Sequence, residues 1–147
     1  MEIFKKIADK RAKSKVQEFS LDELPNASEV NESERLYAVG VTHKQNELYK
    51  VARHIGWRPK MRESSEHFMP VILRREENMQ ASGGEAVAIY FYNIHIGYVS
   101  EDDLRSVKKR ISSLTNAKEV RADAKLCCNP IEKLTDASNR WYVTYEA

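Results

Sequence analysis

The chain has 147 residues, a length that fits one domain with a tail and that can bury a core without disulfide or metal support. Hydrophobic residues make up 41% and charged residues 31% of the chain, an ordinary globular mixture that argues against a fibrous or disordered protein. We expect a cytoplasmic protein, because no apolar run has the length of a signal peptide or a membrane span and because the adjacent Cys127 and Cys128 are poorly placed to form a disulfide.

The formal net charge of +2 hides an uneven distribution of charge along the chain. Residues 1–15 contain six Lys or Arg, residues 16–34 contain six acids and no base, and residues 35–75 contain nine bases against three acids. A local excess of positive charge such as that in 35–75 can attract polyanions, although a solvated face and a charged linker account for the same counts.

The first 34 residues are predicted to lie outside the main domain. Residues 1–19 have the composition of a basic helical arm with a patchy apolar stripe, and residues 25–34 are polar, as in an acidic linker. The domain itself is expected to span residues 35–147.

The domain opens with a predicted strand over 35–41. A helix is predicted next, because Leu48, Val51, Ala52 and Ile55 recur at helical spacing and Gly56 lies where a C-terminal cap belongs. A basic loop with an exposed Trp57 follows over 57–66, and the next strand is expected over 67–76, with Pro70 near a sheet edge. Residues 78–84 have the composition of a turning loop.

Residues 86–99 predict a β-hairpin with Tyr92 and Asn93 as a two-residue turn, since Asn tolerates the left-handed conformation. Side chains alternate along a strand, so one face of the hairpin would be apolar and form the core. That face consists of Val87, Ile89, Phe91, Ile94, Ile96 and Tyr98. On the other face Tyr90 lies opposite His95, as a hydrogen-bonded structural pair. Ala88 lies opposite Gly97, a gap that another backbone or a ligand would fill.

Ser100 is predicted to cap a helix whose buried stripe includes Leu104, Val107 and Ile111. Two more strands follow over 118–128 and 140–146. About five strands in mostly antiparallel order and two or three helices indicate a mainly β, α+β fold: a small, partly open barrel of OB or SH3-like type.

Four segments occur in an order that resembles the HIRAN domain. They are Val39-Gly40-Val41-Thr42-His43-Lys44-Gln45, Arg75-Glu76, Ala86-Val87-Ala88-Ile89 and Ile96-Gly97-Tyr98-Val99. The resemblance covers about 36–105 and depends on the order and spacing of the segments together. It implies a β-barrel that binds nucleic acid, in DNA-remodelling members the 3′ end of single-stranded DNA. It also implies a stand-alone member of bacterial or phage-like type, since the chain carries no phosphate-binding loop of a motor.

The chain departs from the HIRAN pattern where DNA-end binders recognise the strand end. The loop from Asn78 to Ala86 is one residue longer and lacks the Tyr and Asp that stack on a base and bind the terminal hydroxyl in those members. Thr42 and His43 stand where those members keep Arg and Tyr. The resemblance therefore supports the fold more strongly than it supports binding of a DNA end.

Basic and aromatic residues interleave in 49–62, a pattern that suits phosphate contacts and base stacking. The candidate nucleic-acid-binding residues are Thr42, His43, Lys44, Arg53, Trp57, Arg58, Lys60, Arg74, Arg75, Asn78 and Tyr98. For Trp57 the alternative is that the ring simply closes the helix end against the barrel.

No nucleophile or paired-carboxylate motif indicates an enzyme, and no ligand spacing indicates a metal or other cofactor. We expect a non-catalytic module for single-stranded or end-bearing DNA in DNA repair or processing. The alternative is a protein-interaction adaptor that uses the barrel and the N-terminal arm and has lost DNA-end binding.

Overall fold

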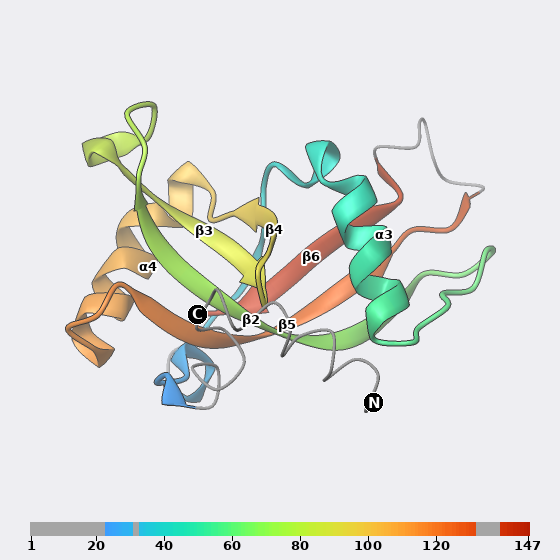
Figure 1. Ribbon diagram of the computed structural model, residues 1–147, viewed down its shortest axis with the longest axis horizontal. Coiled ribbons are helices and arrows are strands. Elements are labelled where there is room, and N and C mark those ends of the chain that lie inside the picture. The colour runs from blue at the N-terminus through green and yellow to red at the C-terminus, as the bar shows by residue number, and fades with distance from the viewer. Residues whose placement is uncertain (1–22, 31–32, 132–138) are drawn as a thin grey trace.

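A computed structural model describes residues 23–30, 33–131 and 139–147 (Figure 1). The strands are β1 (Arg35–Tyr37), β2 (Ser65–Glu77), β3 (Glu85–Phe91), β4 (Ile94–Tyr98), β5 (Glu119–Cys128) and β6 (Trp141–Glu146). The helices are α3 (Gln45–His54) and α4 (Glu101–Leu114), with short 3-10 turns η1 (Ala27–Glu29), η2 (Val41–His43) and η3 (Ser82–Gly84). The expected basic helix over 1–19 lies outside the described residues.

The six strands form one antiparallel sheet in the order β1-β6-β5-β2-β3-β4. The prediction of a mainly β, α+β fold is confirmed. Among the described residues, strand pairing does not close the sheet into a barrel. One isolated antiparallel bridge, between Val39 and Tyr98, joins the segment after β1 to the end of β4.

The core lies on the sheet face that packs against α3 and α4. In the middle of β2 the alternate side chains Met69, Val71 and Leu73 are fully buried in this core, as expected for side chains on one face of a strand. The helices contribute residues spaced three and four apart, Leu48, Val51 and Ala52 in α3 and Leu104, Val107 and Ile111 in α4.

The predicted cap of α4 is confirmed. The Asp103 backbone N–H donates to Ser100 Oγ at 3.3 Å, while the Ser100 hydroxyl donates to the Asp103 carboxylate at 2.8 Å. The three acids that open α4 also suit the positive end of its dipole. These local interactions set the start of the helix directly after β4.

The hairpin forms, but its expected register was wrong beyond the turn. Phe91 pairs with Ile94 and Tyr90 with His95, as expected, whereas a bulge then pairs Ile89 with Gly97. Tyr98 consequently moves one position and pairs with Ala88, which takes it out of the predicted apolar face. A single extra residue is enough for this change because side chains alternate with a period of two.

Tyr92, with φ 51°, is the residue of the turn that adopts the left-handed conformation. The expectation that Asn93 would adopt it was also wrong. Val87, Ile89 and Ile96 are nevertheless fully buried, as predicted for the apolar face. The core placement of the hairpin therefore survives the bulge.

The gap expected beside Gly97 is filled by another stretch of backbone. A Cβ placed on Gly97 would lie 3.0 Å from the Val39 carbonyl oxygen and 3.4 Å from Ala38 Cβ. Here the chain makes the isolated bridge, in which the Val39 N–H donates to Tyr98 O at 2.8 Å and the Tyr98 N–H donates to Val39 O at 2.9 Å. Glycine permits this close approach because it has no side chain.

Two expected strands differ in detail. The strand predicted over 35–41 ends at Tyr37, because Gly40 adopts a left-handed conformation (φ 77°) and the chain enters η2. β2 is an interior strand, and Pro70 lies in its first part, which pairs with β5. The pairing of β2 with β3 begins only at Ile72.

The predicted linker includes a segment that packs on the sheet. Asn26 forms a parallel bridge with Arg121 in β5, and Ala27 is fully buried. The Ser28 hydroxyl donates to the Glu146 carbonyl at 2.8 Å and accepts from the Asp123 N–H at 2.6 Å. These contacts attach the segment before β1 to the end of the sheet.

Candidate nucleic-acid interface

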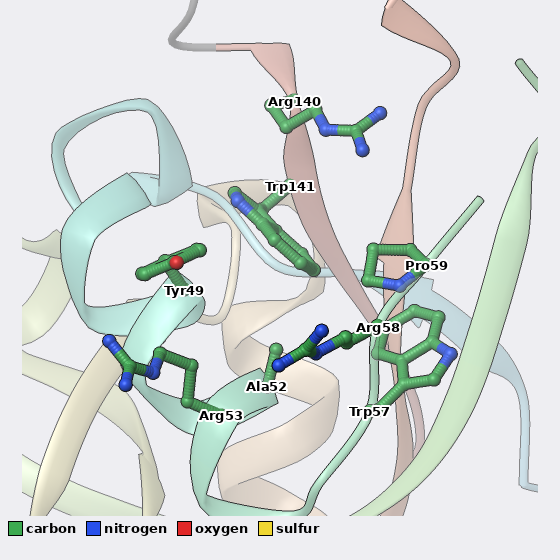
Figure 2. Close-up of a pocket in the computed structure, with 8 residues that line it drawn as sticks. All are labelled: Tyr49, Ala52, Arg53, Trp57, Arg58, Pro59, Arg140 and Trp141. Atoms are coloured by element: carbon green, nitrogen blue, oxygen red, sulfur yellow. The ribbon is translucent and has the colours of Figure 1, made fainter. Parts of the chain in front are cut away.

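A groove opens between α3, the loop that follows it and the start of β6 (Figure 2). Its cavity volume is ≈ 650 Å³, and the described residues that line it include three arginines and three large aromatic rings but no acid. The lining residues are Tyr49, Ala52, Arg53, Trp57, Arg58, Pro59, Arg140 and Trp141. Such a combination of concavity, aromatic surface and positive charge is typical of a ligand site.

The helical repeat places one wall of the groove. Tyr49, Ala52 and Arg53 are three and four residues apart, so they share one face of α3. Gly56 has a positive φ of 72° and ends the helical course, and the Trp57 N–H donates to the Ala52 carbonyl at 2.9 Å. The chain therefore turns back beside the helix, and the loop forms the opposite wall.

Gln45 fixes β6 to the first turn of α3. Its side-chain amide donates to the Trp141 carbonyl at 2.9 Å, and its amide oxygen accepts from the Trp141 N–H at 2.8 Å. A third bond runs from the same amide to the Val41 carbonyl at 2.8 Å. Both backbone polar groups of Trp141 are thus paired, and its ring is held at the base of the groove.

Of the three aromatic rings of the groove, that of Trp141 contacts the other two edge to face. The ring centroids of Trp57 and Trp141 lie 6.0 Å apart at 73°, and those of Tyr49 and Trp141 lie 6.4 Å apart at 66°. Trp141 is only 7% exposed, whereas Tyr49 is 52% exposed. Trp141 therefore forms a floor, and the accessible aromatic surface belongs mainly to Tyr49.

The arginines surround this aromatic floor. The Arg53 guanidinium lies 5.9 Å from the Tyr49 ring centroid, and the Arg140 guanidinium lies 5.9 Å from that of Trp141. Arg140 also donates to the Asn129 carbonyl. Within the described part of the chain, Arg53 and Arg58 form no ion pair with a carboxylate, which leaves their positive charge uncompensated beside the groove.

Positive charge continues along α3. A second, smaller cavity of ≈ 320 Å³ is lined by Lys50, Arg53 and His54. Arg53 lines both cavities, so they are neighbours on the exposed side of the helix. The basic surface consequently extends beyond the groove.

The structure brings three of the predicted binding residues, Arg53, Trp57 and Arg58, together in the groove. Lys60 lies farther along the same loop in an ion pair with Glu63, at 3.3 Å. Trp57 does close against its surroundings, since its ring also lies 5.6 Å from that of His67, but part of it stays accessible. The structural role suggested for Trp57 and a place in the groove are therefore compatible.

A second group of predicted residues lies near the Val39–Tyr98 bridge. Thr42 and His43 are exposed in η2, and Lys44 follows directly. The Tyr98 ring packs edge to face against His95, with centroids 4.6 Å apart. This group is not part of the groove lining.

His95 and Tyr90 are neighbours, with ring centroids 5.2 Å apart, but the expected hydrogen bond between them was wrong. Tyr90 donates to the Glu76 carboxylate at 2.7 Å, and a His95 ring nitrogen lies 2.9 Å from the Gly97 carbonyl. Burial, the Glu76 hydrogen bond and its negative charge raise the pKa of Tyr90 to about 12. Burial, followed by the positive charge of Lys44, lowers the pKa of His95.

The remaining predicted residues have partners within the fold. Arg74 forms an ion pair with Glu119 at 3.0 Å, and Arg75 forms one with Glu85 at 2.6 Å. Consecutive residues of a strand point to opposite faces, so these two arginines do not act on one surface. Asn78 accepts from the Gln80 N–H at 3.0 Å and thereby shapes the turn after β2.

Tyr49, Arg140 and Trp141 line the groove but were not among the predicted binding residues. Tyr49 carried a usable signal, since it lies four residues before Arg53 and begins the interleaved stretch of bases and aromatics. Arg140 and Trp141 carried none, because they are distant in sequence and enter the groove only through the pairing of Trp141 with Gln45.

No protein-family model, no curated protein and no solved structure matches this chain. The resemblance to the HIRAN domain therefore stays a prediction. Among the described residues, no cluster of three or more His, Cys, Asp or Glu could hold a metal ion. No helix in that part of the chain is long and apolar enough to cross a membrane.

Proposed function

We propose that the protein is a non-catalytic nucleic-acid-binding module that takes single-stranded or end-bearing DNA in cytoplasmic DNA repair or processing. The observation that carries the proposal is the groove, whose described lining holds three arginines and three aromatic rings without an acid. The HIRAN resemblance supports the same class of ligand independently of the groove. The two buried free thiols, Cys127 and Cys128, fit a reducing compartment.

Binding of a single strand needs two kinds of contact. Lys and Arg neutralise backbone phosphates and release counterions, and aromatic side chains stack on bases. Arg53 and Arg58 supply positive charge that no carboxylate of the described residues pairs with, and Tyr49 supplies an exposed ring beside them. The groove combines both contacts within one site.

The test is the salt dependence of oligonucleotide binding, measured by fluorescence anisotropy with a labelled single strand. In the double variant Arg53→Gln/Arg58→Gln, the log-affinity against log-salt slope should become shallower by about 0.7 for each phosphate that the protein no longer neutralises. The matched control is Arg105→Gln/Lys109→Gln, which removes two exposed charges from α4, away from the groove. Absence of salt-dependent binding by the unaltered protein at low ionic strength would refute the proposal.

The second candidate is a protein-interaction adaptor. It is favoured by exposed aromatic side chains on the sheet face that points away from the core. Tyr37 is 64% exposed and Phe68 is 55% exposed, and the Tyr37 ring stacks on that of Tyr142 with centroids 6.1 Å apart. This candidate predicts that Tyr37→Ser/Phe68→Ser abolishes recovery of a protein partner and leaves oligonucleotide binding unchanged. Partner recovery that survives these substitutions would count against a role for that face.

A further inference from the structure

We infer that the groove seats one unpaired nucleobase, flat against Tyr49 and the Trp57 loop and above the Trp141 floor. This inference depends on the proposed function, and it identifies which chemical part of the nucleic acid enters the site. The flanking phosphates lie on Arg53 and Arg58, one on each wall.

The first argument is the shape and composition of the groove. Its two walls come from different elements, α3 and the following loop, and Figure 2 shows Tyr49 and Pro59 on either side of Trp141. The floor is apolar, because it is formed by Ala52 and by the ring of Trp141, which are 2% and 7% exposed. The flat face of a base can cover this aromatic surface, whereas a phosphate alone would leave it uncovered.

The second argument is the position of the cations around the rings. Arg53 lies over Tyr49 and Arg140 over Trp141, each at 5.9 Å. Guanidinium planes stack on unpaired bases as aromatic rings do, while their N–H groups remain available to phosphate oxygens. The same residues can therefore contact a base and the backbone beside it.

The third argument is the basic surface next to the groove. Lys50, Arg53 and His54 line the adjoining cavity on the exposed side of α3. A strand whose base enters the groove beside Arg53 would carry its next phosphates over this cavity. The site is then a base pocket with a phosphate track on one side.

A base in a duplex offers no free ring face, because its neighbours already stack on both sides. Entry into the groove therefore requires an unpaired base, as in a single strand or a frayed end. The inference predicts a preference for single strands that comes from stacking rather than from charge.

The chain contains two tryptophans, Trp57 and Trp141, and both line the groove. Intrinsic tryptophan emission therefore reports directly on occupancy of this site. Three labelled probes are titrated at low salt: oligothymidylate, an abasic deoxyribose-phosphate strand of the same length, and a shorter duplex with the same total number of phosphates. Anisotropy gives the affinity of each probe, and unlabelled forms of the three give the tryptophan emission.

Oligothymidylate should quench the tryptophan emission. The abasic strand should bind roughly 5- to 150-fold more weakly and leave the emission unchanged, since one stacked base accounts for that range of affinity. Tyr49→Leu should weaken oligothymidylate binding without weakening the abasic strand, and Tyr49→Phe should restore oligothymidylate binding. The duplex should bind no more tightly than the abasic strand.

Equal affinity for the abasic and thymidylate strands, with unchanged tryptophan emission, would overturn the inference and leave the proposed function intact. Salt-dependent binding that Tyr49→Leu and Arg53→Gln/Arg58→Gln leave unaltered would place the nucleic acid elsewhere on the protein and overturn the inference as well. No binding of any probe would refute the proposed function itself.

Discussion

Replacing Gly97 tests the close packing of the segment after β1 against β4, which brings the two edges of the sheet together. In Gly97→Ala the new methyl group would lie 3.0 Å from the Val39 carbonyl oxygen, a backbone atom that cannot rotate away. That oxygen accepts the 2.9 Å hydrogen bond from Tyr98, and the neighbouring Ala38 N–H is bonded to the Val143 carbonyl at 3.0 Å. The methyl group can be accommodated only if this bonded segment moves.

The expected cost follows from opposing effects. Overpacking of a well-packed site costs about 1–3 kcal/mol, while Gly→Ala reduces the entropy of the unfolded chain and returns about 0.4–1 kcal/mol. We therefore expect Gly97→Ala to lower the free energy of unfolding by about 1–2 kcal/mol. Gly97→Val should lower it further, because its branched side chain meets the same oxygen and also Val41 Cγ1, which lies 3.4 Å from the added Cβ.

Urea unfolding followed by tryptophan fluorescence measures the effect, with Ser113→Ala on the exposed side of α4 as a control expected to stay within about 0.5 kcal/mol of the unaltered protein. The midpoint should fall with an unchanged slope. Amide exchange at Val39 and Tyr98 should accelerate in the variant. An Ala or Val variant as stable as the unaltered protein would show that the Val39 backbone does not pack closely against Gly97.

Three further predictions concern the α4 cap, the half-buried Tyr90 and two buried thiols. Ser100→Ala should lower the free energy of unfolding by about 1 kcal/mol because it removes the α4 cap, and Ser100→Asp should retain most of it in urea unfolding. Burial and the hydrogen bond to Glu76 raise the pKa of Tyr90 to about 12 from an ordinary value of 10. The stabilising contribution of this phenol is therefore complete below pH 10 and is lost as the pH rises through 12. In Tyr90→Phe, a tyrosinate absorbance titration should lose one phenol that ionises near pH 12, and loss of a phenol that ionises near pH 10 would contradict the burial and the Glu76 contact of this side chain. Cys127 and Cys128 are 2% and 0% exposed, and burial raises the pKa of both thiols. A thiol reagent should therefore react with them only when the protein unfolds, so that the labelling rate equals the unfolding rate.

Local patterns were sufficient for much of the fold. The apolar spacing of Leu48, Val51 and Ala52 predicted α3, the Ser100–Asp103 pair predicted the start of α4, and alternation predicted the buried face of the hairpin. Each of these signals depends on interactions within a few residues, which is why a single sequence was enough to find them. The prediction of basic and aromatic residues around 53–58 was local in the same sense.

The register beyond the hairpin turn was not a local property. A bulge at His95–Ile96 moves Tyr98 to the other face, where it meets His95 and bridges to Val39. An alternating sequence is compatible with either register, and the packing of the segment around Val39 against Gly97 discriminates between them. The sequence showed that something must approach Gly97 but did not show what.

The sequence by itself determined the two helices, most of the strands and core side chains, and the basic, aromatic character of residues 49–62, because these depend on spacing and composition. Only the tertiary structure decided that Arg74 and Arg75 are paired with Glu119 and Glu85, and that Arg140 and Trp141 complete the groove with α3. The physical reason is that a charge is compensated, and a cavity is lined, by whichever side chains the fold brings close, at any separation along the chain.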